Sequence, residues 1–171
     1  MRREDGFTLS ELLIVMLVMS IVLTLGAYSF RRYWQTRALH GSLDQVVAEL
    51  RGEQQRATSE SHPWIWGAWF KQGTPRWGVV RANASTGTCE VKDRRTLSTG
   101  VVVSSVSFTD VTTPAISASC TAAAESGAEV VLFFARGTAT QGTVSLSHPE
   151  VGGGSARTIT VSPITGRVAA P

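Results

Sequence analysis

The side chains that most often perform catalysis are few and scattered in this sequence. The three histidines, His40, His62 and His148, stand alone, and none belongs to an HExxH motif or a cysteine–histidine arrangement. The two cysteines, Cys89 and Cys120, lack the spacing of a zinc site. The sequence therefore predicts no catalytic residue, no bound metal and no cofactor, and it does not indicate an enzyme.

One acidic side chain has a more informative position, because it lies inside a long apolar segment. From Phe7 to Tyr28 the only charged side chain is Glu11. The segment is about as long as a helix needs to cross a bilayer. A carboxylate there costs roughly 2.5–3.5 kcal/mol on insertion scales, so that by default it marks a function.

Two simpler interpretations of this segment remain open from composition alone. A secretory signal peptide would have a shorter apolar core and a small-residue cleavage site after it, and residues 26–30, GAYSF, are an imperfect context for that. A plain one-pass anchor accounts for the length and for the flanking Arg31 and Arg32. It gives no role to Glu11.

Residues 6–13, GFTLSELL, resemble the processing motif of type IV pilins and type II secretion pseudopilins. The resemblance implies that a dedicated prepilin peptidase and methyltransferase cleaves after Gly6, removes a leader of residues 1–6, and N-methylates the new N-terminal Phe7. Glu11 would then be the family's acid at the fifth mature position. The other partners implied are pilin or pseudopilin subunits and an inner-membrane assembly platform.

Elementary electrostatics agrees with that resemblance. Cleavage would give Phe7 an α-amine with an ordinary pKa of about 7.7–8.0, so that it can carry a positive charge near neutral pH. In a bundle of parallel helices this amine can pair with Glu11 of a neighbouring subunit. A missing partner leaves a buried charge, which is strongly destabilising. Glu11 is thus expected to set the register of assembly.

The orientation in the membrane follows from the flanking charges and the motif together. Arg2 and Arg3 favour a cytoplasmic N-terminus, whereas Arg31 and Arg32 favour the opposite orientation. The processing motif decides between them. We expect a single-pass inner-membrane protein with its leader in the cytoplasm and its C-terminal domain outside, which later enters a filament.

The apolar segment, residues 7–28, is expected to continue as an amphipathic stalk helix over residues 29–60. Its apolar stripe recurs at helical spacing and comprises Leu39, Leu43, Val46, Val47 and Leu50. A helix from Phe7 to Glu60 would be roughly 80 Å long at 1.5 Å per residue. Gly26, Gly41 and Gly52 are points where it could bend, and the stripe is expected to pack on the domain that follows.

Residues 61–171 have the composition of a single antiparallel β domain. Short apolar or alternating runs between turn residues predict strands at 64–70, 76–82, 88–92, 100–108, 129–135, 142–147 and 157–162. Segments 109–127 and 150–155 are expected to be loops, and the aromatic cluster around Trp64, Trp66, Trp69, Phe70 and Trp77 is expected to be mostly core. The predicted fold class is α+β, a long N-terminal helix packed on an antiparallel sheet domain.

The C-terminal part narrows the resemblance to the GspH/FimT-type minor pilins. Residues 133–137, FFARG, residues 158–162, TITVS, and residues 166–168, GRV, carry it. Some DNA-uptake members of that type use a GRxR pattern to touch DNA. Here Arg167 matches the first arginine and Ala169 replaces the second.

Charge allows DNA contact without requiring it. The formal net charge is +3 and resides in residues 61–171, which carry nine basic and six acidic side chains. Contacts with phosphates need several converging cations. The candidates are Arg136, Arg157 and Arg167, with Arg94 and Arg95 as further possibilities, and the alternative is a solvated basic rim.

Cys89 and Cys120 allow two interpretations. Outside the membrane a disulfide is plausible, and it would contribute roughly 3–4 kcal/mol at this spacing. Otherwise the two are small buried apolar residues.

The function expected is structural, namely a minor pilin or pseudopilin that helps to initiate or cap a type IV pilus or a secretion pseudopilus. The alternative is a DNA-binding minor pilin of a competence pilus. A third hypothesis is an unprocessed, membrane-anchored enzyme or binding domain.

Overall fold

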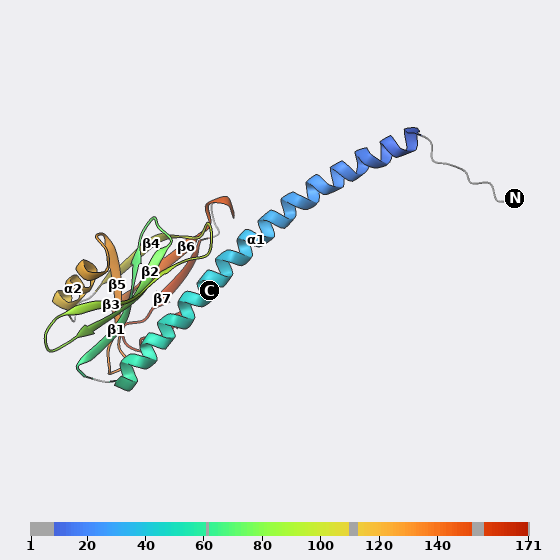
Figure 1. Cartoon of the computed structure of the whole chain (residues 1–171). Helices are drawn as coiled ribbons and strands as arrows, with labels where there is room; N and C mark the ends of the chain where they lie inside the picture. The colour runs from blue at the N-terminus through green and yellow to red at the C-terminus, as the bar shows by residue number, and fades with distance from the viewer. Residues whose placement is uncertain (1–8, 61, 110–112, 152–155, 171) are drawn as a thin grey trace. The chain divides into compact units, whose positions relative to one another are not determined.

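The computed structural model describes residues 9–60, 62–109, 113–151 and 156–170, without the side chain of Tyr28. These residues form eleven elements, from a long helix α1 (Leu9–Glu60) to a short strand β8 (Val168–Ala169). The chain divides into two compact units, Met1–Trp34 and Gln35–Pro171, and helix α1 contributes residues to both. Figure 1 shows these elements in chain order.

Helix α1 is continuous through all three glycines at which a bend was conceivable. In the second unit its apolar stripe is buried, and Leu39, Val46 and Leu50 are almost inaccessible to solvent. The side chains at these positions recur every three or four residues, so they line one face of the helix. The expected packing of this half of the helix on the β domain is confirmed.

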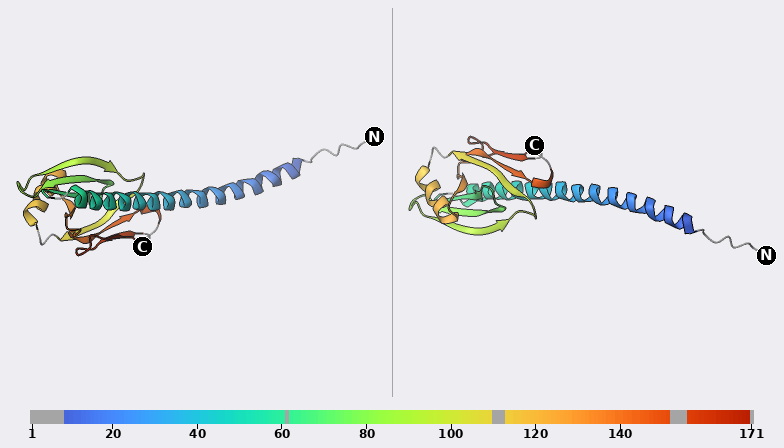
Figure 2. Two further views of the ribbon diagram at one scale, coloured as in Figure 1. Left: turned by 90° about the horizontal axis from the view of Figure 1, so that it is seen from below. Right: turned by 90° about the horizontal axis from the view of Figure 1, so that it is seen from above.

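The strands of the second unit form two four-stranded antiparallel sheets. The first sheet has the order β3-β2-β1-β5, and the second has the order β4-β6-β7-β8. The bounds of the strands are β1 Trp64–Lys71, β2 Arg76–Asn83, β3 Cys89–Thr96, β4 Val102–Thr109, β5 Ala128–Phe133, β6 Gln141–Ser147 and β7 Arg157–Val161. In Figure 2 the two sheets lie on opposite sides of the second unit's length of α1.

The main core fills the space between α1 and the two sheets. Leu43 and Leu50 of the helix, Trp77 of the first sheet and Ile159 of the second belong to one cluster of buried apolar side chains. The sheets are also joined by a polar contact, because the backbone N–H of Phe108 donates to Oε2 of Glu129 at 2.8 Å. The α+β class expected from the sequence is confirmed, and the antiparallel strands of the domain form two sheets.

Strand β1 is apolar on both of its faces because both faces are covered. Trp66 and Phe70 belong to the cluster shared with α1, whereas Ile65 and Trp69 belong to a second cluster on the other face. Gly67 fits the centre of this strand, since a Cβ there would lie 2.1 Å from the carbonyl oxygen of Val131 on β5. The expectation that most of the aromatic cluster is core is confirmed.

A second helix corrects the expectation that residues 109–127 are a loop. Helix α2 (Pro114–Ala124) has a proline at its first turn, a position that proline favours. Its buried side chains are Ile116, Cys120 and Ala124, which are spaced by four and lie against the first sheet. The Thr/Ser/Ala composition suggested a loop, but alanine is the best helix former and the spacing is helical.

Other boundaries differ from expectation by a few residues. Strand β3 continues to Thr96 instead of ending at residue 92, because its alternating polar side chains pair along β2. Strand β5 ends at Phe133, two residues early, where a turn begins. In the expected loop 150–155, Pro149–Val151 form a 3-10 turn, η1, and residues 152–155 lie outside the described part.

Candidate functional site

Glu11 lies in the first turn of α1. A carboxylate there is favoured electrostatically, because the first turn of a helix carries a partial positive charge. Gly6 and Phe7, the predicted processing residues, lie outside the described part of the chain. The role assigned to Glu11 in pairing with an amine therefore stays a prediction.

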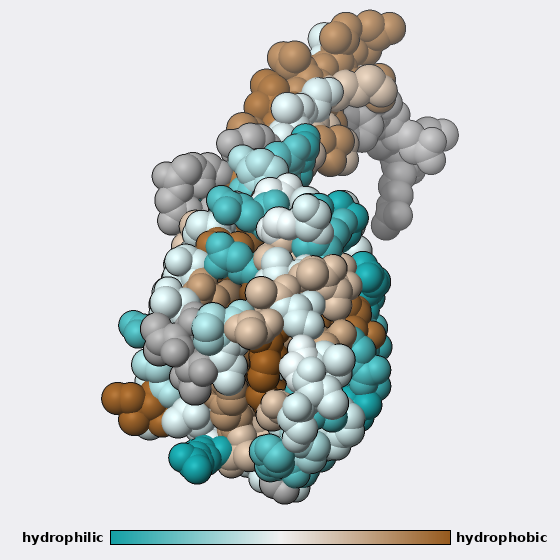
Figure 3. Space-filling view, turned by 90° about the vertical axis from the view of Figure 1, so that its left-hand side faces the viewer, coloured by the Kyte–Doolittle hydropathy of each residue, from teal (hydrophilic) through white to brown (hydrophobic). Residues whose placement is uncertain are grey.

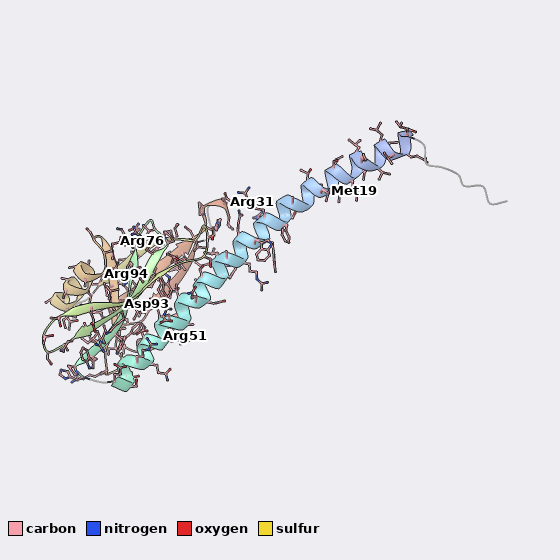
Figure 4. The ribbon with its side chains drawn as sticks, viewed as in Figure 1. Met19, Arg31, Arg51, Arg76, Asp93 and Arg94 are labelled. Atoms are coloured by element: carbon pink, nitrogen blue, oxygen red, sulfur yellow. A yellow bond between two sulfur atoms is a disulfide. The ribbon has the colours of Figure 1, made fainter. Side chains whose placement is uncertain are left out.

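Apolar side chains surround the helix in the first unit. Large apolar residues from Leu9 to Leu25 are more than half exposed, and the side chains around Met19 project on several sides in Figure 4. Among the described residues, α1 is the helix whose length and composition would allow it to cross a membrane. A helix that is apolar all round needs lipid or other helices as its surroundings.

Two hydroxyl groups within this apolar length donate to the backbone of the helix itself. Ser20 Oγ donates to the carbonyl oxygen of Met16 at 2.8 Å, and Thr24 Oγ1 donates to that of Ser20 at 2.7 Å. Such bonds let serine and threonine reside in lipid without an unpaired donor.

In the second unit, polar contacts fix α1 to both sheets. Gln54 Nε2 donates to the carbonyl oxygen of Thr165 at 3.0 Å, and Ser42 Oγ accepts from the backbone N–H of Ser98 at 3.2 Å. Arg95 Nη1 pairs with Glu49 Oε2 at 2.8 Å. The helix is thus tied along its length to the loop after β3, to β3 itself and to the turn before β8.

Glu53 is a buried carboxyl on this helix that the sequence interpretation did not single out. Its Oε1 accepts from Arg56 Nη1 at 2.6 Å, whereas Oε2 is buried and has no hydrogen-bond partner. Burial raises the pKa of Glu53 to about 7, against the opposing charge of Arg56. Its position could have been found, since 46, 50, 53 and 57 continue the helical spacing of the apolar stripe.

The structure brings the two cysteines together as a disulfide. Cys89 at the start of β3 and Cys120 of α2 have Cα atoms 4.9 Å apart. The bridge therefore attaches α2 to the outer face of the first sheet. In the loop-entropy account a bridge over 31 residues contributes roughly 3–4 kcal/mol to stability.

The three candidate arginines for DNA contact do not all converge. Arg136 and Arg167 lie in turns that touch, because the carbonyl oxygen of Gly137 is 2.7 Å from where a Cβ on Gly166 would be. Arg157 pairs with Leu146 at the other end of β7 and β6. The second unit thus gathers two of these cations at one end and keeps the third away.

The two further arginines are held by other residues of the fold. Arg95 pairs with both Glu49 and Asp93, and its hydrogen bond lowers the pKa of Asp93. Arg94 lies over the ring of Trp69, 5.9 Å from its centroid. Figure 4 shows Asp93 and Arg94 as neighbours on β3. Neither arginine joins the turns of Arg136 and Arg167.

The histidines are also dispersed in space. His40 is exposed on α1 and His62 is exposed before β1, whereas His148 is buried beside Gly100. No group of three potential metal ligands occurs among the described residues.

These features define a class of protein before any comparison. An apolar N-terminal helix carries one acid in its first turn, and the C-terminal half of the same helix packs in the core of a β domain. That arrangement is a pilin-like fold, and its apolar N-terminal length is sufficient to cross a membrane.

Comparison with known proteins agrees with that class. Residues 1–27 match the prokaryotic N-terminal methylation motif. The structure resembles that of the minor pseudopilin EpsH from the type 2 secretion system of Vibrio cholerae, with a TM-score of 0.55 and 12% sequence identity over 78% of this chain and 95% of that chain. No curated protein matches the chain in sequence.

The motif match is confined to the first 27 residues, and the likeness to EpsH shows a shared pilin-like fold.

Proposed function

We propose that this protein is a minor subunit that helps to initiate or cap a type IV pilus or a secretion pseudopilus. The observation that carries the proposal is the position of Glu11, one acid in the first turn of an otherwise apolar helix that continues into the β domain. The likeness to a minor pseudopilin supports the minor role. In this proposal residues 12–28 pack in the filament core and the β domain faces outward.

The proposed route begins in the inner membrane. The leader lies in the cytoplasm, the second unit lies outside, and the peptidase cleaves after Gly6 and methylates Phe7. An inner-membrane assembly platform then moves the mature chain into the filament. The α-amine of Phe7 in one subunit pairs with Glu11 of the next, so that the charge is neutralised without water.

The mass of the protein isolated from membranes and from sheared filaments tests this proposal. We expect the chain in both fractions to have lost residues 1–6 and gained one methyl group. The leader would be kept in a strain without the peptidase, which is the control. An intact leader in the strain with the peptidase, or absence of the chain from filaments, would contradict the proposal and favour a simple membrane anchor.

DNA binding is the second candidate, and the contact between the turns of Arg136 and Arg167 favours it. Both guanidinium groups belong to exposed residues, and among the described residues neither makes an ion pair. Two neighbouring cations can hold adjacent phosphates, although stronger binders use more. The replacement of the second arginine of the GRxR pattern by Ala169 predicts weak affinity.

Gel-shift titration of the full chain in detergent with duplex DNA at about 50 and 200 mM salt tests this candidate. Two phosphate contacts predict that affinity falls about tenfold over that range. The double variant Arg136→Gln, Arg167→Gln should abolish the shift, while Arg157→Gln should leave it unchanged. Lack of a shift at the lower salt concentration would exclude DNA as a ligand.

A further inference from the structure

A groove opens at the end of the second unit where α1 terminates. We call it the end groove, and its apolar floor consists of Trp64, Ile65, Phe134, Ala139, Pro163 and Ile164. The cavity volume is about 900 Å³. That volume is at the upper end of the range for sites that hold small ligands or peptide side chains.

One apolar residue of the end groove, Ile164, is strongly exposed to solvent. Ile164 is 81% exposed, and it is the one large apolar side chain in the described part of the second unit that is exposed to this degree. Figure 3 shows one face of the molecule, on which apolar atoms lie between more polar ones. Exposed apolar surface with a polar border is typical of a contact with another protein.

The charges at the edge of the end groove favour an acidic partner. Arg136 lies at the tip of the turn from Phe134 to Gly137, where the backbone N–H of Gly137 donates to the carbonyl oxygen of Phe134 at 2.9 Å. His62, which precedes β1, also lines the groove, and no described lining residue is acidic. A guanidinium at such an edge binds a carboxylate well, often through two parallel hydrogen bonds.

The position of the end groove in the fold indicates which proteins it meets. Helix α1 ends at Glu60, two residues before His62. In the proposed filament the subunits pack side by side, so that each domain has the domains of other subunits as its neighbours. The end groove therefore faces either the domain of another subunit or, in a subunit at the tip, open space.

We propose that the end groove binds an extended, apolar segment of another pilin or pseudopilin subunit, and that this segment carries a carboxylate. This inference rests on the filament role proposed above. The apolar floor takes alternate side chains of the segment, and Arg136 pairs with its carboxylate. Such pairing would couple this subunit to one specific neighbour. Nucleic acid fits the groove less well, because an apolar floor with one edge guanidinium lacks converging cations.

Site-specific photo-crosslinking of the full chain in filament-producing cells tests the proposal. A photoreactive residue replaces Ile164, and in the control it replaces Thr99. Thr99 is exposed and lies in the loop after β3, next to Ser98, whose backbone N–H donates to Ser42 of α1. Thr99 is not among the residues that line the end groove. Each of the other pilin subunits made by the same cells carries an epitope tag. We expect an adduct with one tagged subunit from position 164 and none from position 99.

Two variants in the same cells test the chemistry of the groove. With the crosslinker at 164, Arg136→Glu should lower the adduct yield about tenfold, whereas Arg136→Lys should keep most of it. Mass spectrometry of the adduct should identify a segment of the partner with apolar residues beside an acidic residue or a free C-terminus. Unchanged cysteine pairing and melting temperature in both variants would show that the fold is intact.

Several outcomes would overturn the proposal. They are the lack of an adduct with any tagged subunit, an adduct with lipid only, an adduct within the chain itself, or equal yields from positions 164 and 99. If the chain enters filaments without an adduct from position 164, the groove proposal fails and the filament role stands. If the chain is absent from filaments, both fail.

Discussion

Replacement of Glu11 by alanine is expected to leave processing after Gly6 largely intact and to remove the protein from filaments. Without the carboxylate, the α-amine of a neighbouring Phe7 would have to enter the apolar filament core unpaired. Removing one partner of a buried pair costs roughly 3–5 kcal/mol, which corresponds to more than about a hundredfold in an assembly equilibrium. Quantification of the chain in membrane and sheared-filament fractions measures the effect.

Two further variants separate charge from packing at this position. Glu11→Gln keeps nearly the same volume and loses the negative charge, so that it should fail in the same way as alanine. Thr24→Ala is the matched control on the same helix, because the hydroxyl of Thr24 donates locally to Ser20 and is not expected to take part in assembly. Normal filament levels of the glutamine variant would show that the pairing mechanism is wrong.

The N-terminal half of this structure could be predicted well from sequence, for a physical reason. A helix in lipid satisfies its own backbone hydrogen bonds, so an apolar stretch of the right length has one main structural solution. The packing of the second half of the helix was equally predictable. The apolar residues from Leu39 to Leu50 recur at the helical period, which identifies the face that is buried. The acid at Glu11 was informative because any charge in such a segment is costly.

The β domain was less predictable, because its long-range pairings are not local properties of the chain. Alternation identified most strands, but nothing in their residues told that β5 pairs with β1 while β4 pairs with β6. Helix α2 was missed because serine and threonine are frequent in both loops and helix ends. The end groove combines residues from several separate segments, so only the folded chain shows it.

Arg136 and Arg167 illustrate the same limit at the level of single side chains. Their separation in sequence gives no indication that their turns touch, and the contact depends on two glycines with positive φ, Gly137 at 78° and Gly166 at 59°. Arg157 is closer in sequence to Arg167 but lies at the far end of its strand. Residue type alone grouped all three arginines, whereas the fold brings together the turns of only Arg136 and Arg167.

The buried carboxyl of Glu53 is expected to make the second unit more stable in mild acid than at neutral pH. Burial raises its pKa from 4.5 to about 7 in the folded chain. Between those two values the folded chain holds a proton that the unfolded chain has released, so that stability falls as pH rises from about 4.5 through about 7 and then levels off. The shift corresponds to about 3 kcal/mol at most.

The groups that face Glu53 limit this effect without reversing it. Arg56 and Arg95 favour its ionised form, and Glu49 disfavours it. Arg95 is already engaged by Glu49 and Asp93. No hydrogen-bond donor of the described residues lies within reach of Oε2 to stabilise the ionised carboxylate. The folded chain therefore favours the protonated form of Glu53.

Thermal unfolding of the full chain in detergent between about pH 4.5 and 8.5 measures the prediction. Tryptophan fluorescence reports on the second unit, since Trp64, Trp66, Trp69 and Trp77 lie in β1 and β2. Glu53→Gln cannot ionise, so it should melt at a higher temperature than the unmodified chain at about pH 8, by several degrees. The difference should shrink or vanish near pH 5, and Asp44→Asn, on an exposed part of the same helix, should change neither value.

A melting temperature of the unmodified chain that rises steadily from about pH 5 to pH 8, with the same slope in Glu53→Gln, would show that the buried carboxyl does not govern this dependence.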